Sequence, residues 1–452
     1  MKFKSFPYVF LILISFIMAH SVCYAKNLSI AEAKNILEEH TGKAGYKFDA
    51  VEGVVLPGTR ERGRIVAKLP NGEEHLLQQC YNFAVDKNGM ILSLYLDQVK
   101  LENLQFIQKF QNIKSLYISD ADIKSMKGIT ELKKLVEIRI RNSKVRKIEG
   151  LYNLPSLKYL QLSGNEITKI EGLDSIPSLV YLNLSFNKIE KIENLGNLKN
   201  LTHLDLGLNI KIKKIEGLEK LKKLVNLKVE GQKIKKIEGF EALANLRVLR
   251  LPSTGIKKLE NLNHLVKLEA LSVSSVDRIE NIEKLTNLTL LTLGGGGVQK
   301  IENLKKLTKL TKLSISNTNI KKIEGLNTLT NLRYLKLSKT EIEKIEGLDN
   351  LKNLRILNLS ETPIKKMEGL DNLTNLWELY LRDTQITELE NYENLIHLDS
   401  LSLYSDTPLS DESEFKFDVF RDHLNKNKSK VSRKIYKKET TYYNPRWDYP
   451  EY

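Results

Sequence analysis

The chain has 452 residues and a formal net charge of +15 at pH 7, and 28% of its residues are charged. This length allows two or three ordinary domains or one elongated domain. The two cysteines, at positions 23 and 80, exclude a disulfide-stapled scaffold and a Cys-x-x-Cys zinc site. The basic excess is compatible with anionic partners, so the positions of the lysines decide whether such a partner is expected.

The first 25 residues have the pattern of a secretory signal peptide. Lys2 and Lys4 precede an apolar run, and Cys23 and Ala25 put small residues at the two positions that determine cleavage. We therefore predict cleavage near Ala25 and a secreted or cell-envelope protein. Two alternatives stay open. One is an N-terminal membrane anchor, although the run is shorter than the ~20 residues of a span, and the other is lipidation of Cys23.

Residues 26–90 do not repeat and are predicted to form an N-terminal cap or a small α+β domain. Ser29 and Glu32 make a capping box in front of an amphipathic helix at about residues 30–40. Strand-like runs follow within residues 45–56, 62–69 and 75–89. A solenoid needs its first edge covered, which favours the cap.

A repeat of 22 residues fills residues 91–409. The segment LKYLQLSGNEITKIEGL from Leu157 aligns with LVYLNLSFNKIEKIENL from Leu179. With the first leucine of a unit as position 1, about 15 units follow at steps of 22 residues, except for one step of 23 and one of 20. The units begin at Ile91, Ile113, Leu135, Leu157, Leu179, Leu201, Leu224, Leu246, Leu268, Leu288, Leu310, Leu332, Leu354, Leu376 and Leu398.

Each unit combines a short strand with a turn. Apolar residues recur at positions 1, 4, 6, 11 and 14, and the alternation around positions 4 and 6 predicts a strand with one buried face. Position 9 is asparagine in the middle units and threonine later, where a buried side chain can bond the backbone of neighbouring coils. Glycine or asparagine at position 16 predicts a residue with positive φ. One unit cannot bury its own leucines, but stacked units can.

This pattern, LxxLxLxxNxIxxIxGL, resembles the leucine-rich repeats of the internalins and of the cytosolic regulatory subunits of protein phosphatase. The resemblance implies an α/β solenoid, a horseshoe or arc with a concave parallel sheet, capped at both ends. It also implies protein recognition without catalysis. No sorting signal or immunoglobulin-like region follows the repeats, and a phosphatase regulator would require the signal-peptide prediction to be wrong.

The repeat lysines are predicted to form a solvated outer surface. Position 13 is usually lysine and position 15 usually glutamate, as in Lys169 with Glu171 and Lys191 with Glu193. These opposed charges keep a long rod soluble. A nucleic-acid groove needs unopposed basic residues mixed with aromatics, so no nucleic acid is expected as a partner.

After the repeats the composition changes. Residues 410–424 are predicted to be a C-terminal cap helix. Residues 425–452 form a basic and aromatic tail, which we interpret as flexible, with docking on an anionic surface or glycan as the functional alternative.

The run Gly294–Gly297 raises the question of a phosphate-binding loop. It occupies positions 7 to 10 of its unit, and neither a following Lys-Ser/Thr nor a regular helix supports a nucleotide site. The run comes one unit after the shortened repeat, so we predict that it absorbs a local irregularity in the stack between residues 268 and 310.

Positions 3, 5 and 7 of each unit face away from the core and are free to contact a ligand. Tyrosine, tryptophan and arginine carry much of the energy of protein interfaces. The candidate protein-binding residues on this concave face are Tyr95, Tyr117, Arg139, Arg141, Tyr159, Tyr181, Tyr334, Lys336, Trp377, Tyr380 and Arg382.

These observations predict an exported, monomeric, non-catalytic protein that binds a partner protein. No catalytic residue, metal ligand or cofactor is expected, because no nucleophile–base pair or metal-ligand spacing departs from the repeat. Binding of a glycan or another anionic polymer, through the aromatic face or the tail, is the main alternative. A purely structural role in the envelope is a further one.

Overall fold

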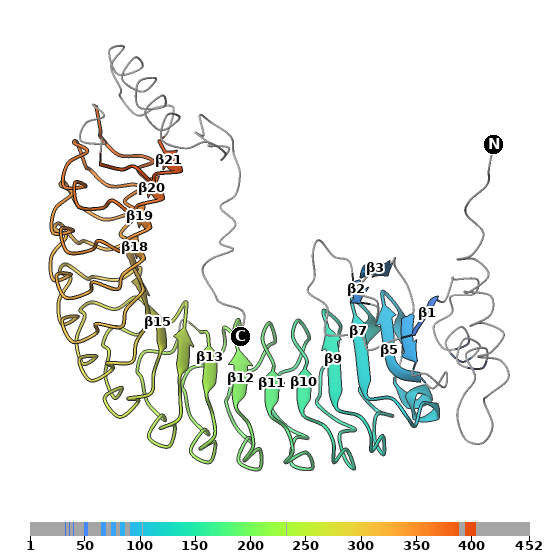
Figure 1. Cartoon of the computed structure of the whole chain (residues 1–452). Helices are drawn as coiled ribbons and strands as arrows, with labels where there is room; N and C mark the ends of the chain where they lie inside the picture. The colour runs from blue at the N-terminus through green and yellow to red at the C-terminus, as the bar shows by residue number, and fades with distance from the viewer. Residues whose placement is uncertain are drawn as a thin grey trace, which may run out of the picture. The chain divides into compact units, whose positions relative to one another are not determined.

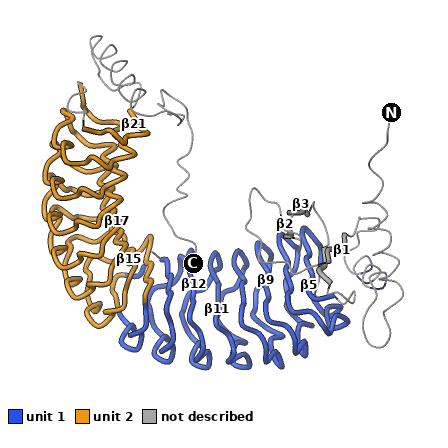
Figure 2. Tube along the Cα trace, viewed as in Figure 1, with its two compact units in different colours: residues 1–234, 238–246 blue, residues 235–237, 247–452 orange. Residues whose placement is uncertain are grey.

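The computed structural model describes residues 91–101, 103–231, 233–387 and 394–403, together with the backbones of four short strands before residue 91 and the helical residues Glu32, Ile36 and Glu39. The chain forms two compact units, residues 1–234 with 238–246 (unit 1) and residues 235–237 with 247–452 (unit 2), which Figure 2 colours separately. The predicted signal peptide, cap helix and tail lie outside the described residues.

Unit 1 contains the first seven repeat strands, which pair in parallel in chain order (Figure 1). They are β5 (Ile91–Asp97), β7 (Ser115–Ser119), β9 (Glu137–Arg141), β10 (Tyr159–Gln161), β11 (Tyr181–Asn183), β12 (His203–Leu206) and β13 (Asn226–Val229). The first two repeats also contain β6 (Lys100–Leu101), which pairs in parallel with β8 (Asp122–Ile123), and a 3-10 helix, η1 (Gln105–Lys109).

Unit 2 continues the same arrangement, again with one strand per repeat in parallel pairing. Its strands are β14 (Val248–Leu251), β15 (Ala270–Ser274), β16 (Leu290–Gly294), β17 (Lys312–Ser316), β18 (Tyr334–Lys336), β19 (Ile356–Asn358), β20 (Glu378–Tyr380) and β21 (Ser400–Ser402). The predicted parallel-sheet solenoid is confirmed.

Before the repeats, the described backbone contains β1 (Asp49–Glu52), β2 (Ile65–Lys68), β3 (Glu74–Leu77) and β4 (Asn82–Val85). Each falls within or overlaps a predicted strand-like run. β4 pairs antiparallel with β5, and β1 pairs parallel with β4, so the outer edge of the first repeat strand is paired. Ile36 is buried, whereas Glu32 and Glu39 are exposed, as an amphipathic helix requires. The role of residues 26–90 as a cap stays a prediction.

The core is a stack of leucine and isoleucine side chains inside the coils. In the unit that begins at Leu157, the side chains of Leu160, Leu162, Ile167 and Ile170 are fully buried. Burial of such a side chain contributes roughly 1.5–3 kcal/mol. Since the neighbouring coils supply most of the covering atoms, the stability of each coil depends on the next.

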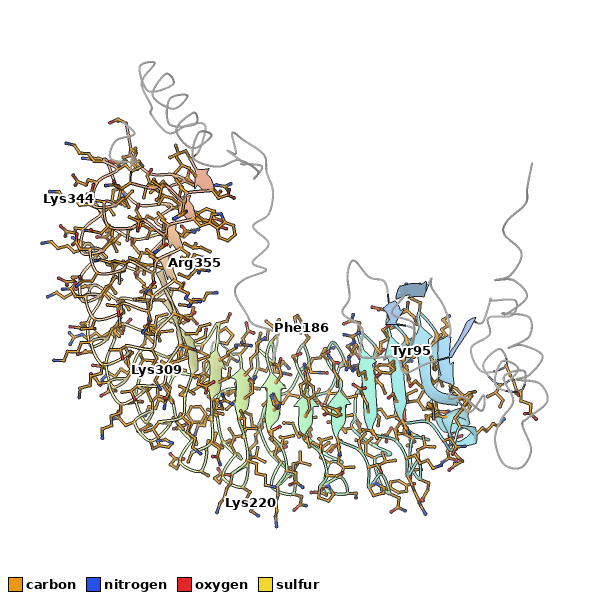
Figure 3. All side chains as sticks on the ribbon, in the orientation of Figure 1. Tyr95, Phe186, Lys220, Lys309, Lys344 and Arg355 are labelled. Carbon is orange, nitrogen blue, oxygen red and sulfur yellow. The ribbon has the colours of Figure 1, made fainter. Side chains whose placement is uncertain are left out.

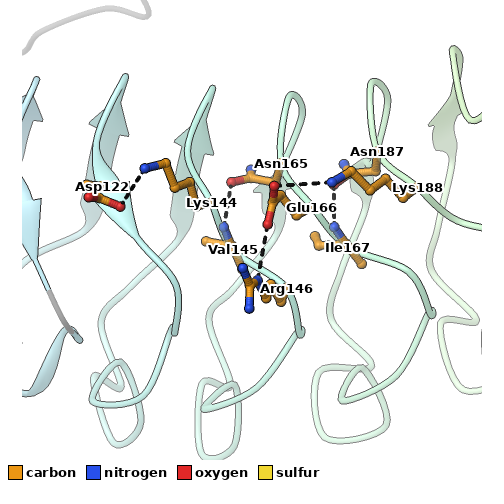
Figure 4. Close-up of polar contacts among 9 residues, drawn as sticks. All are labelled: Asp122, Lys144, Val145, Arg146, Asn165, Glu166, Ile167, Asn187 and Lys188. Atoms are coloured by element: carbon orange, nitrogen blue, oxygen red, sulfur yellow. Dashed lines mark hydrogen bonds and ion pairs between the residues drawn. The ribbon is translucent and has the colours of Figure 1, made fainter.

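The asparagines at position 9 bond neighbouring coils to one another (Figure 4). Asn187 Nδ2 donates to the carbonyls of Leu162 in the preceding coil (2.8 Å) and of Leu184 in its own (3.0 Å). Its Oδ1 accepts the backbone N–H of Ile167 at 3.0 Å. Thr340, Thr362 and Thr384 bond a carbonyl of their own coil instead, as Thr340 does to that of Leu337 at 2.8 Å, whereas the buried Thr318 Oγ1 has no hydrogen-bond partner among the described residues. The predicted role of the asparagines is therefore confirmed.

The turn at position 16 explains why glycine and asparagine alternate there. Gly347 has a φ of 68°, and a Cβ at this position would overlap the carbonyl oxygen of Ile323 in the preceding coil. Asn303 adopts a φ of 63° and donates its Nδ2 to the equivalent carbonyl, that of Ile279, at 2.7 Å. Both residues allow the close approach of the preceding coil's carbonyl, glycine because it lacks a side chain and asparagine because its side chain donates a hydrogen bond to that carbonyl.

The glycine run does not disturb the strand ladder, so the prediction of an irregular stack there was wrong. Gly294 pairs with Ser274 on one side and Ser316 on the other, without a register shift. The two-residue deletion falls outside the strands, between Val276 and Ile279. A Cβ at Gly296 would overlap the Val276 carbonyl, so glycine permits the shortened coil to approach closely.

The lysines at position 13 are exposed, as predicted. Some ion pairs lie within one coil, such as that of Lys191 with Glu193 at 3.6 Å. Other ion pairs join neighbouring coils close to the strands. Glu166, for example, pairs with both Arg146 and Lys188 at 3.1 Å (Figure 4), and these partners hold the pKa of its carboxyl below the usual range. Exposed pairs of this kind contribute little stability individually.

We expect Asn187→Ala to destabilise unit 1 by about 2–4 kcal/mol, because it leaves buried carbonyls and one N–H without their partner. Asn187→Thr should destabilise less, since threonine occupies the same position in later coils. Urea unfolding followed by hydrogen exchange of coils 157–222 measures both. Equal stability of the alanine variant and the wild type would contradict the assigned role.

Candidate binding face

In each of the two compact units, the side chains at positions 3, 5 and 7 of the repeats form one continuous surface, which we call the sheet face. In β7 and β9 the burial alternates between half-buried and buried residues, so the odd positions point out of the core. Lysines such as Lys220 lie on the outer turns, away from Tyr95 and Phe186 (Figure 3). In these strands the sheet-face side chains therefore lie outside the leucine core.

In unit 1, an aromatic and cationic stack crosses three adjacent strands. The rings of Tyr95 and Tyr117 are parallel, with centroids 4.5 Å apart, and the Arg139 guanidinium lies 5.3 Å from the Tyr117 ring centroid. All three occupy position 5 and are register partners in the sheet. Tyr95 is only 7% exposed, so it supports Tyr117 and offers little surface of its own.

Glu137 fixes the geometry of this stack. Its carboxylate accepts a hydrogen bond from Tyr117 Oη at 2.5 Å and one from Arg139 Nε at 2.5 Å. Burial, and then this hydrogen bond to Glu137, raise the pKa of Tyr117 to about 12. Burial also raises the pKa of Tyr95. Both phenols are thus neutral and held in place before any ligand arrives.

A second row runs along position 3 of the next three strands. Tyr159, Tyr181 and His203 are register partners, with ring centroids 6.4 Å apart for the first pair and 6.1 Å for the second. Tyr159 is 44% exposed. Desolvation lowers the pKa of His203, so its imidazole is neutral at pH 7 and continues the aromatic row.

Apolar side chains stand at the rim that follows this row. Phe186 is 58% exposed and Ile210 is 65% exposed, and Phe186 lies at this rim in Figure 3. Phe186 and Leu208, at position 8 of adjacent units, have φ of 55° and 56°. Most other units place glycine, asparagine or another small or polar residue there. A bulky apolar residue with positive φ is strained, and such strain is typical of functional positions.

In unit 2, the predicted residues form two separate groups. Tyr334 and Lys336 lie on β18, where Lys312 Nζ of the neighbouring strand sits 4.7 Å from the Tyr334 ring centroid. Asn358 of β19 separates Lys336 from Tyr380 along position 5. The two groups therefore do not touch as those of unit 1 do.

The second group of unit 2 lies on and beside β20. Tyr380 Oη donates to Glu378 at 2.6 Å, and Arg382 Nε donates to Ser402 Oγ at 2.7 Å. Trp377, 48% exposed, precedes the strand and stands outside the sheet face proper.

The remaining predicted residue, Arg141, ends β9 in unit 1, at position 7. Each predicted residue is thus present near the face, but only the unit 1 residues form contiguous stacks.

Sequence reasoning missed four contributors: Glu137, His203, Lys312 and Phe186. The first three occupy position 3 of their units, beside the predicted tyrosines, and a register alignment of the units would have placed them there. Phe186 is detectable as an aromatic residue at position 8, where the turn requires positive φ.

No group of three or more His, Cys, Asp or Glu side chains is placed to hold a metal ion in the described part of the chain. No helix of that part is both long and apolar enough to cross a membrane.

Comparison with known proteins agrees with this architecture. The family described as leucine-rich repeats (two copies) matches residues 155–197 and 330–372. No curated protein sequence gives a match.

Solved structures share the fold. They include the functional domain of InlJ from Listeria monocytogenes, with 24% identity, a TM-score of 0.58 and coverage of 70% of this chain and 68% of that one. An LRR protein of Leptospira interrogans gives 24% identity, a TM-score of 0.59 and coverages of 70% and 90%. The internalin inlF of Listeria monocytogenes has 23% identity and a TM-score of 0.52, and the match covers 67% of this chain and 82% of that one.

The raised pKa of Tyr117 predicts a pH effect with a definite sign. Stability from the neutral phenol is complete below pH 10, the pKa of an unperturbed tyrosine, and is lost as the pH approaches about 12. We therefore expect wild-type stability to fall relative to Tyr117→Phe over this range. Parallel urea unfolding at pH 9 and pH 11.5 tests this, and a constant difference between the two proteins would contradict it.

Proposed function

We propose that this chain, a leucine-rich-repeat protein that resembles the internalins in fold, is a non-catalytic protein that binds a partner protein through the sheet face of its repeats. The repeats bury their leucines against one another and leave positions 3, 5 and 7 for recognition. The function therefore depends on which side chains occupy those positions.

The observation that carries the proposal is the ordered aromatic surface of unit 1. Tyr117 is held between Tyr95, Arg139 and Glu137, and Tyr159 extends the surface through its contact with Tyr181. Side chains that are already fixed lose little conformational entropy on binding. Tyrosine and arginine in such arrangements are frequent energetic centres of protein interfaces, and the exposed Phe186 adds an apolar contact beside them.

Location and assembly belong to the same proposal. The signal-peptide pattern of residues 1–25 supports export to the envelope or the medium, where a monomer would meet its partner. Recognition, rather than chemistry, is supported because the sheet-face residues of unit 1 are engaged in stacking and hydrogen bonds with one another.

An affinity experiment tests the proposed face. Residues 26–452 serve as bait, and the affinity of each captured protein is then measured in purified form for the wild type, Tyr159→Ala/Tyr181→Ala/Phe186→Ala and Tyr334→Ala/Tyr380→Ala/Arg382→Ala. We expect at least one variant to bind about 30-fold more weakly, which corresponds to roughly 2 kcal/mol, with little change in Tm.

The matched control for the first variant is Lys147→Ala/Lys169→Ala/Lys191→Ala, which removes exposed side chains from the outer turns of the same coils and of the coil before them. It should bind like the wild type. If both face variants keep the wild-type affinity, or if the outer-turn control loses it, the sheet face is not the binding surface.

A second candidate ligand is an anionic polymer or surface, bound through the tail. Between Lys426 and Lys438 the tail contains seven lysines and arginines, and tyrosines and a tryptophan follow. Binding through these residues would weaken steeply with salt, and deletion of residues 425–452 would abolish it. Binding to polyanion-coated resin that survives the deletion would contradict this candidate.

A further inference from the structure

Two adjacent turns of unit 1 expose apolar side chains at the rim of the sheet face. Phe186 is 58% exposed and Ile210 is 65% exposed, and Leu208, on the same turn as Ile210, is half-buried. The two turns are neighbours, because the backbone N–H of Phe186 donates to the carbonyl of Gly207 at 2.8 Å. We call Phe186, Leu208 and Ile210 the apolar tip. Single exposed apolar residues are ordinary, whereas a cluster of them indicates a contact surface.

The extra residue of the 23-residue repeat lies in this tip. Ile210 and Lys211 stand between Asn209 and Ile212, where the preceding unit has Lys188 alone. The turn closes through a hydrogen bond from the backbone N–H of Ile212 to the carbonyl of Asn209 at 3.0 Å, and Ile212 is fully buried. The insertion therefore leaves the leucine core intact and adds an apolar side chain to the surface.

Neither packing nor turn geometry explains the other two members of the tip. Phe186 and Leu208 have φ of 55° and 56°, and the equivalent residues of other units include Asn142 and Asn317, with φ of 49° and 57°. Asparagine tolerates this conformation better than a bulky apolar residue does. Phenylalanine and leucine are thus unfavourable at these positions within the fold, which points to a contact outside it.

Hydrogen bonds hold the tip in place. Glu230 Oε2 accepts the backbone N–H of Leu208 at 3.2 Å. Asn209 Nδ2 donates to the carbonyl of Leu184 at 2.9 Å, and its Oδ1 accepts the N–H of Ile189 at 3.1 Å. A turn that is already ordered loses little conformational entropy when it meets a binding surface.

A group of lysines lies beside the tip. Lys211 Nζ pairs with Glu190 Oε1 at 2.7 Å. The hydrogen bond from Lys211 holds the pKa of the Glu190 carboxyl below its usual range, and the charges of Lys213 and Lys233 act in the same direction. All four side chains are exposed. Three cations against one carboxylate leave a net positive charge, and we call Lys211, Lys213 and Lys233 the cationic cluster.

We propose that the apolar tip and the cationic cluster contact the surface of a membrane that contains anionic lipids. The tip side chains enter the boundary between headgroups and acyl chains, and the lysines lie among the headgroup phosphates. The contact needs no partner protein, so it lies beyond the proposed function.

Charge and placement favour a lipid surface over an apolar groove of a protein. Phe186 stands at the rim, away from the outer turns that carry Lys220 (Figure 3), so the tip meets a flat surface before the sheet face does. Apolar side chains beside exposed lysines are typical of segments that lie in the interface of anionic membranes. Three apolar side chains and a small net charge give weak, reversible attachment.

Sedimentation with lipid vesicles tests the proposal on residues 26–452. We expect the wild type to bind vesicles of phosphatidylcholine and phosphatidylglycerol more strongly than vesicles of phosphatidylcholine alone. Phe186→Asn/Leu208→Asn/Ile210→Asn should lower the partition coefficient on the mixed vesicles at least about tenfold. Asparagine suits the positive φ, so the Tm should change little. Lys213→Gln/Lys233→Gln should lower the partition coefficient about threefold or more.

Matched controls remove similar side chains elsewhere. Val266→Asn/Ile396→Asn replaces residues of unit 2 that are 49% and 47% exposed and should bind like the wild type. Lys300→Gln/Lys322→Gln removes two exposed lysines from outer turns of unit 2 and should also have little effect.

A local probe separates the tip from the basic C-terminal tail, which binds anionic vesicles under the second candidate function. In a Cys80→Ser background, an environment-sensitive nitrobenzoxadiazole label on Ile210→Cys should gain emission when mixed vesicles are added. The same label on Lys169→Cys, on an outer turn, should not. Attachment through the tail alone would leave both labels unchanged.

The outcomes are decisive for the membrane contact. It is overturned if the triple asparagine variant partitions like the wild type, if the Val266 and Ile396 control loses as much binding, or if the label at position 210 does not respond. In that case a purified partner whose affinity depends on Tyr159 and Tyr181, which lie outside the tip, would leave the proposed function standing. A dependence on Phe186 as well would assign the tip to the protein interface.

Discussion

The structure depends on one constraint: a single coil of this chain cannot cover its own leucines. Each coil has five or six apolar side chains and only a three- to seven-residue strand, so burial is completed by the coils on either side. Parallel backbone pairing and the asparagine bonds at position 9 hold those neighbours at a fixed spacing. Because this packing uses the even strand positions, the side chains at the odd positions of every repeat point out of the core. Together they form a periodic surface.

The same division of labour explains how the surface varies. In unit 1 the odd strand positions hold tyrosines, an arginine and a glutamate that order one another, whereas those of β15 to β17 hold mostly small and hydroxyl-bearing residues. The strands of unit 1 thus present ordered aromatic side chains, and β15 to β17 present a more polar row of side chains. Under the proposed function, the first surface contacts a partner through burial of aromatic area and the second through hydrogen bonds.

Much of this fold could be predicted from the sequence, because residues at the same position of successive repeats become register partners in the sheet. Leu160 and Leu182 occupy the same position in aligned units and are register partners in the sheet. The stack of Tyr95 on Tyr117 follows from the same alignment, but the bond from Tyr117 to Glu137 depends on rotamers that no spacing encodes. The glycine run misled for a related reason. The deletion in one coil was expected to make the stack locally irregular, but it falls in the loop between Val276 and Ile279 and the strand register is unchanged.

That placement of the shortened loop has a consequence for the history of the molecule. Insertions and deletions of one or two residues, as in the repeats of 23 and 20 residues, fall outside the strands and leave the order of the strand residues intact. A change in the length of a coil is thus separate from a change in the side chains of its strand face. A gene of this kind can lengthen, shorten or duplicate its coils while point substitutions on the strands are selected independently for what they touch.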